Sequence, residues 1–171
     1  VFLGPLDTPK AIAKTDLEDE NAVSFGLGNV GELSWKSLLD VYSCTECGRC
    51  TDVCPAAMTG KSLSPMDVVC DVKHDVFEQQ ESLLFNLANR RQSDSAESPK
   101  EILPLVREGS PVTADVLWAC TSCRACEEVC PLDIQHLDLI VEARQHLVII
   151  EATFPGQCQS AVYCLPHSPA S

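Results

Sequence analysis

Aromatic side chains and long apolar runs are scarce in this sequence. Phe, Trp and Tyr together make up 5% of the 171 residues, so aromatic packing contributes little and bound metal could supply part of the free energy of folding. No apolar run approaches the roughly 18 to 20 residues that a membrane-spanning helix needs, so the chain as given is not expected to cross a bilayer. Apolar residues are still 45% of the total, which is ordinary for a globular chain. The length predicts one domain, or one domain with tails.

Basic residues are also in short supply. There are 12 Lys and Arg against 25 Asp and Glu, which gives a formal net charge of -13. A generic nucleic-acid-binding surface needs a basic face, so nucleic acid is excluded as a partner. A protein partner that meets this chain through electrostatics should present a basic surface, although plain solubility explains the same acidity.

The first twenty residues lack the charged, apolar and cleavage-site regions of a secretion signal. Of the 11 cysteines, eight fall into two short runs, which argues against a disulfide framework. We therefore expect a reducing compartment and a cytoplasmic location. The chain begins with Val rather than Met, which suggests a piece of a longer protein.

The two cysteine runs share one spacing, C-x2-C-x2-C-x3-C-P. The first consists of Cys44, Cys47, Cys50, Cys54 and Pro55, and the second of Cys120, Cys123, Cys126, Cys130 and Pro131. Bacterial [4Fe–4S] ferredoxins use this run. Two-residue gaps on a tight loop let three successive thiolates point at one cluster, while the fourth, followed by Pro, turns away. Two copies with identical internal spacing predict two [4Fe–4S] clusters.

In two-cluster ferredoxins the fourth Cys of a run ligates the other cluster. If this chain is such a domain, the first cluster is held by Cys44, Cys47, Cys50 and Cys130, and the second by Cys120, Cys123, Cys126 and Cys54. The two halves also align outside the cysteines, where Thr45 matches Thr121, Val53 matches Val129, and Tyr42 matches Trp118. We therefore expect two helix–loop–helix halves related by a pseudo-two-fold axis, with the clusters close together.

Zinc is the competing metal, because C-x2-C pairs also build tetrahedral zinc sites. Those sites usually combine two pairs separated by a longer span, whereas four Cys packed in one short run with a following Pro suit a cubane better.

Helical patterns dominate the rest of the chain. Helices are expected at 34–43, from the cap at Ser64 onward, at 82–88, at 101–107, after the cap at Thr113, and at 134–150. The predicted fold class is all-α, an α-helical ferredoxin, with 1–33 as an extended or loop segment, 34–153 as the two-cluster domain and 154–171 as an irregular tail. In the first helix, Trp35, Leu38, Leu39 and Tyr42 share one face, which we expect to pack in the core or shield the nearby cluster.

The remaining motifs, cysteines and histidines are not assigned a functional role. Gly26–Gly31 matches G-x-G-x-x-G but lacks the surrounding βαβ pattern, so a turn is expected rather than a nucleotide site. Cys70 is interpreted as a small buried apolar residue rather than a ligand. Cys158 and Cys164 fall in a tail without periodicity and receive no role. His136 and His146 are interpreted as surface or capping residues.

Several segments resemble one family beyond the cysteine spacing. They are Trp35–Cys50, Cys54–Ala56, Thr59–Pro65, Cys120–Cys126 with Cys130 and Pro131, and Glu142–Val148. These segments resemble the iron–sulfur segment of heterodisulfide-reductase-related proteins. The resemblance implies an α-helical ferredoxin domain whose redox partners or fused domains include a cytochrome b-type membrane part and a Cys-rich catalytic domain. Neither part is present in this chain, so a place at the inner face of the membrane would depend on a missing domain or partner.

The combined expectation is an electron-transfer module that relays electrons through two [4Fe–4S] clusters to a catalytic or quinone-linked oxidoreductase. The alternative is a non-redox protein in which metal–thiolate sites, Zn or Fe–S, only staple the fold. A cluster-based sensor would need an output surface such as a basic DNA-binding helix, which the acidic chain does not offer. No nucleophile–base pair is found, so no catalytic residue is named.

Overall fold

The computed structural model describes residues 25–91 and 98–155. Cys158, Cys164 and nearly all of the predicted tail lie outside the described residues. The elements within them are η1 (Val30–Glu32), α1 (Trp35–Ser43), α2 (Arg49–Asp52), α3 (Pro55–Met58), α4 (Pro65–Glu78), α5 (Gln80–Arg91), α6 (Ala114–Trp118), α7 (Ala125–Glu128) and α8 (His136–Ile149). Backbone pairing outside helices in these ranges includes one isolated bridge, between Asn29 and Pro104, and no strand. The described part is therefore all-α, as predicted.

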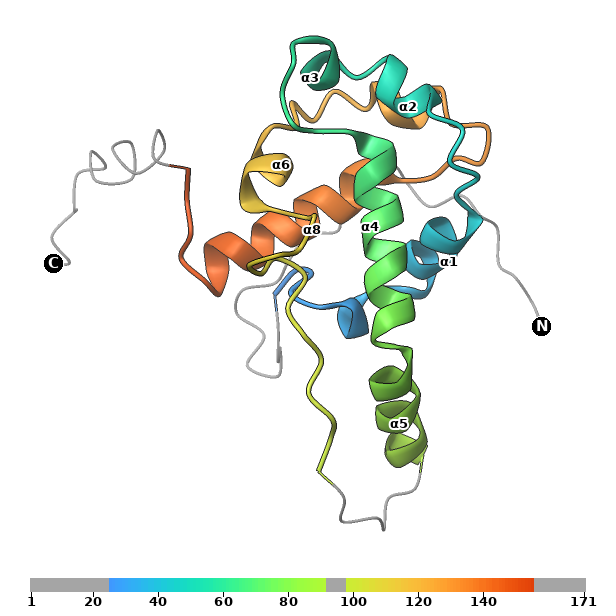
Figure 1. Cartoon of the computed structure of the whole chain (residues 1–171), viewed down its shortest axis with the longest axis vertical. Helices are drawn as coiled ribbons and strands as arrows, with labels where there is room; N and C mark the ends of the chain where they lie inside the picture. The colour runs from blue at the N-terminus through green and yellow to red at the C-terminus, as the bar shows by residue number, and fades with distance from the viewer. Residues whose placement is uncertain (1–24, 92–97, 156–171) are drawn as a thin grey trace, which may run out of the picture.

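The two long helices α4 and α8, drawn in green and orange in Figure 1, both contribute side chains to the apolar core of the fold. α1 packs against α4, α6 packs against α8, and the short helices α2 and α7 pack against each other. α5 continues from the end of α4 and extends away from the rest of the molecule. The fully buried core side chains include Val41, Val69, Val72, Leu117 and Ile140. One contiguous core thus fixes the positions of both cysteine loops.

Three helices begin at a hydroxyl cap. The side chains of Ser34, Ser64 and Thr113 accept hydrogen bonds from backbone N–H groups in the first turns of α1, α4 and α6. Such a cap satisfies one of the N–H groups that a helix start leaves without a partner. The caps predicted at Ser64 and Thr113 are confirmed. In the chain, α4 follows the first cysteine loop and α6 precedes the second.

The predicted orientation of α1 is wrong. Trp35 is 64% exposed and Tyr42 is 47% exposed, so the apolar face neither packs in the core nor covers a cysteine loop. The buried residues of α1 are Ser37, Asp40 and Val41. The physical reason is a hydrogen bond that holds Asp40 on the buried side of α1: its carboxylate accepts from the backbone N–H of Gln135 at 3.1 Å.

The exposed face of α1 forms one wall of an apolar groove. The groove has a volume of about 470 Å³, and the residues that line it are Val30, Gly31, Leu33, Trp35, Leu38, Tyr42, Val76, Gln80, Leu83, Leu84 and Leu87. Tyr42 also meets Phe77 of α4 edge to face, with ring centroids 5.4 Å apart. Trp35, Leu38 and Tyr42 of α1 therefore line a surface groove.

The helix predicted at 101–107 is absent. The backbone N–H of Leu103 donates to Gln79 Oε1 at 2.6 Å, and that of Leu105 donates to the carbonyl of Gly28 at 2.8 Å. Pro104, which has no N–H to donate, lies in the bridge with Asn29. The segment takes an extended path because its backbone groups find partners on other elements.

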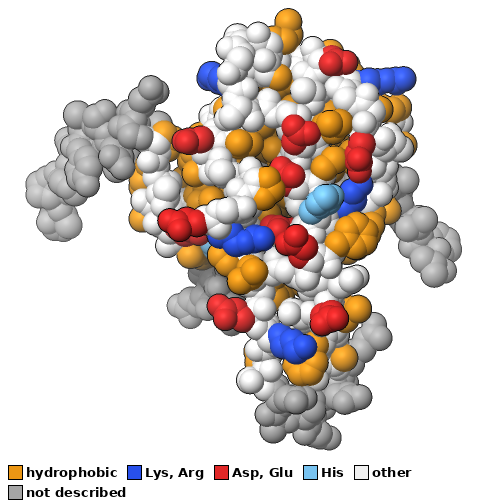
Figure 2. Space-filling view, in the orientation of Figure 1, with side chains coloured by type: hydrophobic (Ala, Val, Ile, Leu, Met, Phe, Trp, Pro, Cys, Tyr) orange, Lys and Arg blue, Asp and Glu red, His pale blue; other side chains and the backbone are white. Residues whose placement is uncertain are grey.

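Acidic side chains are distributed over the face around α4 rather than gathered into one patch, with Lys and Arg among them (Figure 2). Arg107 forms an ion pair with one acidic side chain: its guanidinium donates to both carboxylate oxygens of Asp75 at 3.0 and 2.8 Å. On this face the excess of negative charge is thus dispersed over the surface.

Candidate metal centre

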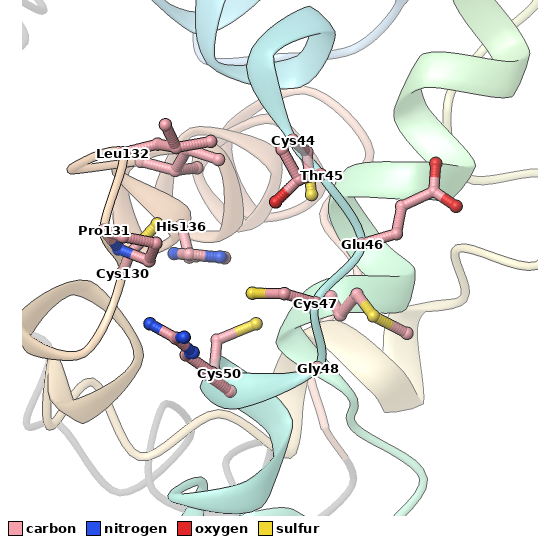
Figure 3. A pocket seen from close by; sticks show the side chains of 13 residues that line it. Cys44, Thr45, Glu46, Cys47, Gly48, Cys50, Cys130, Pro131, Leu132 and His136 are labelled. Atoms are coloured by element: carbon pink, nitrogen blue, oxygen red, sulfur yellow. The ribbon is translucent and has the colours of Figure 1, made fainter.

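The first cysteine loop forms a pocket together with the end of the second loop. Cys44, Cys47 and Cys50 lie on one side of this pocket, and Cys130 lies on the other (Figure 3). The remaining residues that line it are Thr45, Glu46, Gly48, Arg49, Met66, Pro131, Leu132, Ile134 and His136. The fourth cysteine of this pocket thus comes from the opposite half of the chain.

A second pocket has the reciprocal composition. Its cysteines are Cys120, Cys123 and Cys126 from the second loop and Cys54 from the end of the first. The other residues that line it are Leu63, Pro65, Thr121, Arg124, Leu137 and Ile140. All eight cysteines predicted as ligands are thus gathered into two groups of four.

The two loops repeat their backbone conformation residue by residue. Glu46 and Ser122, at equivalent positions, both have φ of 57°. Two residues on, Gly48 (φ 79°) and Arg124 (φ 61°) are both left-handed and are the N-cap residues of α2 and α7 respectively. Left-handed backbone costs a non-glycine residue roughly 1–2 kcal/mol, and such strain is typically stored at functional sites.

Each loop then closes with matching hydrogen bonds. In the first, the N–H of Thr51 donates to the Gly48 carbonyl at 2.9 Å, and the N–H of Cys54 donates to the Thr51 carbonyl at 3.1 Å. In the second, the bonds from Glu127 to Arg124 and from Cys130 to Glu127 measure 3.0 and 3.2 Å. Cys54 itself is extended, with ψ of 117°, and Pro55 follows it at the first position of α3. The backbone at the fourth cysteine is therefore no longer helical, and its thiol is directed away from the first three.

Burial and hydrogen bonding affect the thiols differently. Burial raises the pKa of Cys126 to about 12 and also raises the pKa of Cys50. The exposed Cys123 instead has a lowered pKa, because the backbone N–H of Ala125 and the side chain of Thr121 donate to its sulfur. Metal binding requires thiolates, so loading the buried positions releases protons.

A buried glutamate joins the second loop to α8. Glu127 is 3% exposed, and its carboxylate pairs with Arg124 at 3.2 Å and accepts a hydrogen bond from the backbone N–H of Leu137 at 3.0 Å. Together with the bond from Gln135 to Asp40, it holds the segment between Cys130 and α8 in place. Nothing in the sequence pattern distinguishes these two acids from solvated ones.

Arg144 of α8 supports the start of the second loop. Its guanidinium donates to the carbonyls of Leu117 and Cys120 at distances from 2.6 to 3.0 Å, and it lies over the ring of Trp118. These contacts satisfy carbonyls at the end of α6. No pattern in the sequence marks Arg144 as a supporting residue.

Two further residues prove to lie beside the first pocket. Cys70 is half-buried on α4 rather than fully buried, within hydrogen-bonding reach of the Cys44 thiol, and burial raises its pKa to about 11. The interpretation of His136 as a surface or capping residue is wrong, because it is 2% exposed and lines the pocket. It is buried because the bonds of Gln135 and Leu137, on either side of it, draw the start of α8 inward.

The donor set fits [4Fe–4S] clusters. Four thiols surround each pocket, and thiolates are the ligands that such clusters require. Within the described residues, no group of three or more His, Cys, Asp or Glu is placed to hold a single metal ion. Four thiols line each of the two pockets.

Cysteine loops of this kind on a helical framework are typical of iron–sulfur proteins of the ferredoxin type. The fold and the two pockets place this chain in that class. Comparison with known proteins then gives the family. The model of the 4Fe-4S dicluster domain matches residues 43–134, and the chain belongs to that family. This match to a dicluster domain indicates two [4Fe–4S] clusters as its cofactors.

Three relatives are informative. The chain is 32% identical over 95% of its length to "Probable iron-sulfur-binding oxidoreductase FadF" of Bacillus subtilis, covering 26% of that protein. It is 35% identical over 83% of its length to the EtfAB:quinone oxidoreductase of Syntrophomonas wolfei, covering 21% of it. It is 27% identical over 63% of its length to one subunit of the ferredoxin:CoB-CoM heterodisulfide reductase of Methanosarcina mazei, covering 46% of it.

These relatives confirm the resemblance to heterodisulfide-reductase-related proteins and support a role in electron transfer. The chain spans about a quarter of the length of the first two relatives. No solved structure matches the chain. None of the helices in the described ranges combines the length and the apolar character that crossing a bilayer would take.

Proposed function

We propose that this chain relays electrons through two [4Fe–4S] clusters with crossed ligation. Cys44, Cys47, Cys50 and Cys130 hold the first cluster, and Cys120, Cys123, Cys126 and Cys54 hold the second. The observation that supports this assignment most strongly is the composition of the pockets, because each combines three thiols of one loop with the fourth of the other.

The crossed assignment also brings the two sites close together. Cys50, in α2, belongs to the first pocket, and Cys54, two residues after the end of α2, belongs to the second. A separation of four residues corresponds to about 6 Å along a helix at 1.5 Å per residue. The same relation holds for Cys126, in α7, and Cys130, two residues after the end of α7. The matched loops and the contact of α2 with α7 support a pseudo-two-fold arrangement of the halves.

The protein contributes geometry and environment. When bound, the clusters supply one-electron redox chemistry, and their potentials depend on burial and on hydrogen bonds to sulfur. The rigid loops fix the sulfur positions, and the apolar side chains Leu63 and Ile140 limit water around the second pocket. Cys47 and Cys123, the middle cysteines of the two loops, are exposed. We infer that partners exchange electrons at these two open sides.

A quinone-linked or catalytic oxidoreductase is the partner we propose, either as a separate protein or as a fused domain. The support is the similarity to the EtfAB:quinone oxidoreductase and to the heterodisulfide reductase of Methanosarcina mazei. The cytochrome b-type membrane part and the Cys-rich catalytic domain implied by the resemblance remain proposals. A cytoplasmic location at the inner face of the membrane fits this role, since quinones reside in the bilayer and the described cysteines are free thiols.

The test is chemical analysis of the anaerobically purified chain, combined with electron paramagnetic resonance (EPR). We expect about eight iron and eight sulfide per chain, which is two cubanes, and an S = 1/2 signal on reduction with dithionite. A double variant, Cys47→Ala with Cys123→Ala, is the matched control and should lose most of the iron. Stoichiometric zinc without sulfide, or clusters that dithionite does not reduce, would favour the structural alternative and contradict the proposal.

A further inference from the structure

His136 places an imidazole at the edge of the first pocket. The residue begins α8 and is 2% exposed. Figure 3 shows its ring beside Cys130 and Pro131, across the pocket from Cys44 and Cys47. The ring comes from the segment that follows Cys130, so the loop that supplies the fourth thiol also supplies the histidine.

The imidazole has an unsatisfied nitrogen. Its Nδ1 is buried and has no hydrogen-bond partner. The backbone N–H of the same residue is used locally, since it donates to the carbonyl of Ile134 at 3.2 Å. A buried polar atom without a partner costs roughly 1–3 kcal/mol. The Ile134 carbonyl is the backbone acceptor next to this ring, so the nitrogen that turns toward the pocket is the one available to a bound group.

Among the described residues that line it, the second pocket has no counterpart to this ring. On its helical side it is lined by Leu137 and Ile140 of α8 together with Leu63. Each pocket also includes one arginine, Arg49 in the first and Arg124 in the second. The imidazole is thus a difference between two sites whose thiols and backbone are otherwise matched.

We propose that the His136 imidazole donates a hydrogen bond to a sulfur of the cluster held by Cys44, Cys47, Cys50 and Cys130, and that this bond makes this cluster the more easily reduced of the two. The inference rests on the proposed function, since it presupposes that both clusters are present. Reduction adds negative charge to a cluster, so a donor to its sulfur stabilises the reduced form and raises the potential. The first added electron then resides in the first pocket.

The variant that tests this is His136→Leu, which keeps an apolar side chain of similar reach and removes the donor. At a fixed solution potential we expect the ratio of reduced to oxidised first cluster to fall about tenfold, which is about 59 mV for a one-electron couple. Redox titration followed by EPR measures the ratio for each cluster. His136→Asn, which restores an N–H donor, should recover part of the effect.

His146 provides the matched control. It lies on the same helix, its Nδ1 is also buried without a partner, and it lines neither pocket. His146→Leu should leave both ratios unchanged. An unchanged ratio in a cluster-loaded His136→Leu protein, or an equal shift in His146→Leu, would overturn the proposal.

A second measurement covers the case in which His136→Leu fails to retain the cluster. In the reduced native protein, pulsed EPR with ¹⁵N-histidine labelling and exchange into D₂O should detect an imidazole nitrogen coupled to a single cluster, together with an exchangeable proton on that nitrogen. Absence of that coupling overturns the inference while leaving the two-cluster assignment intact. Absence of any cluster in the native protein would instead refute the proposed function itself.

Discussion

At the scale of single residues, the proposed cluster ligands can be recognised in the sequence, whereas the side chains that hold the cysteine loops in place cannot. The eight cysteines proposed as ligands are recognisable in the sequence because cluster ligation imposes a fixed spacing on one short run. Asp40, Glu127 and Arg144 are not, because their partners are backbone groups brought close only by folding. The place of His136 is hidden for the same reason, since its burial depends on the bonds that its neighbours make.

Glu127 gives a test at this scale. Glu127→Ala removes the acceptor for the buried N–H of Leu137 and the partner of Arg124, which should destabilise the cluster-loaded protein by about 1–3 kcal/mol. The midpoint of anaerobic thermal unfolding, followed by circular dichroism, should then fall by several degrees. Glu127→Gln, which still accepts from Leu137, should lose less.

The control is Glu128→Ala, because Glu128 lies on the same short helix but is exposed. Its change should stay within about 0.5 kcal/mol. Equal losses from Glu127→Ala and Glu128→Ala would show that the buried carboxylate does not tie the second loop to α8.

At the scale of elements, capping residues locate helix starts well, whereas apolar patterns misjudge the orientation of α1 and the existence of a helix at 101–107. Ser64 and Thr113 locate the starts of α4 and α6 because a cap is a local interaction. The face that α1 buries is set instead by the hydrogen bond between Asp40 and Gln135, which are far apart in the sequence. The apolar stripe of α1 therefore predicts the wrong buried face. The segment 101–107 misleads as well, since its backbone partners lie on Gly28 and Gln79.

The contact between the segment before η1 and α8 can be tested at Gly26. Its φ is 78°, and a Cβ added there would lie 2.2 Å from the carbonyl oxygen of Glu142, a backbone atom of α8. Gly26→Ala therefore combines left-handed strain with a clash that only a backbone shift can relieve. We expect a loss of more than about 2 kcal/mol, because the strain alone costs roughly 1–2 kcal/mol.

Gly109→Ala separates these two effects. Gly109 has a similar φ of 82°, but an added Cβ would meet nothing within 4 Å. Thermal unfolding midpoints should therefore rank the native protein first, Gly109→Ala second and Gly26→Ala last. The reverse order of the two variants would mean that the segment at Gly26 does not pack on α8 as described.

At the scale of the whole molecule, the sequence repeat anticipates two matched loops, and their close approach depends on the core between them. α4 and α8 share that core, and α2 contacts α7. As a result, Cys130 lies across from Cys47, and Cys54 joins Cys120 and Cys126. The exposed groove beside α1 could not be predicted, since an apolar stripe alone does not say whether it will be covered.

The central claim is the crossed ligation of two clusters, and Cys130→Ala tests it most directly. The EPR spectrum of the cluster that remains in this variant should be compared with those of Cys47→Ala and Cys123→Ala, which each remove a ligand from one known loop. If ligation is crossed, Cys130→Ala reproduces the spectrum of Cys47→Ala, because both lose the first cluster. A spectrum that instead reproduces that of Cys123→Ala would show that each loop holds its own cluster, and would contradict the account.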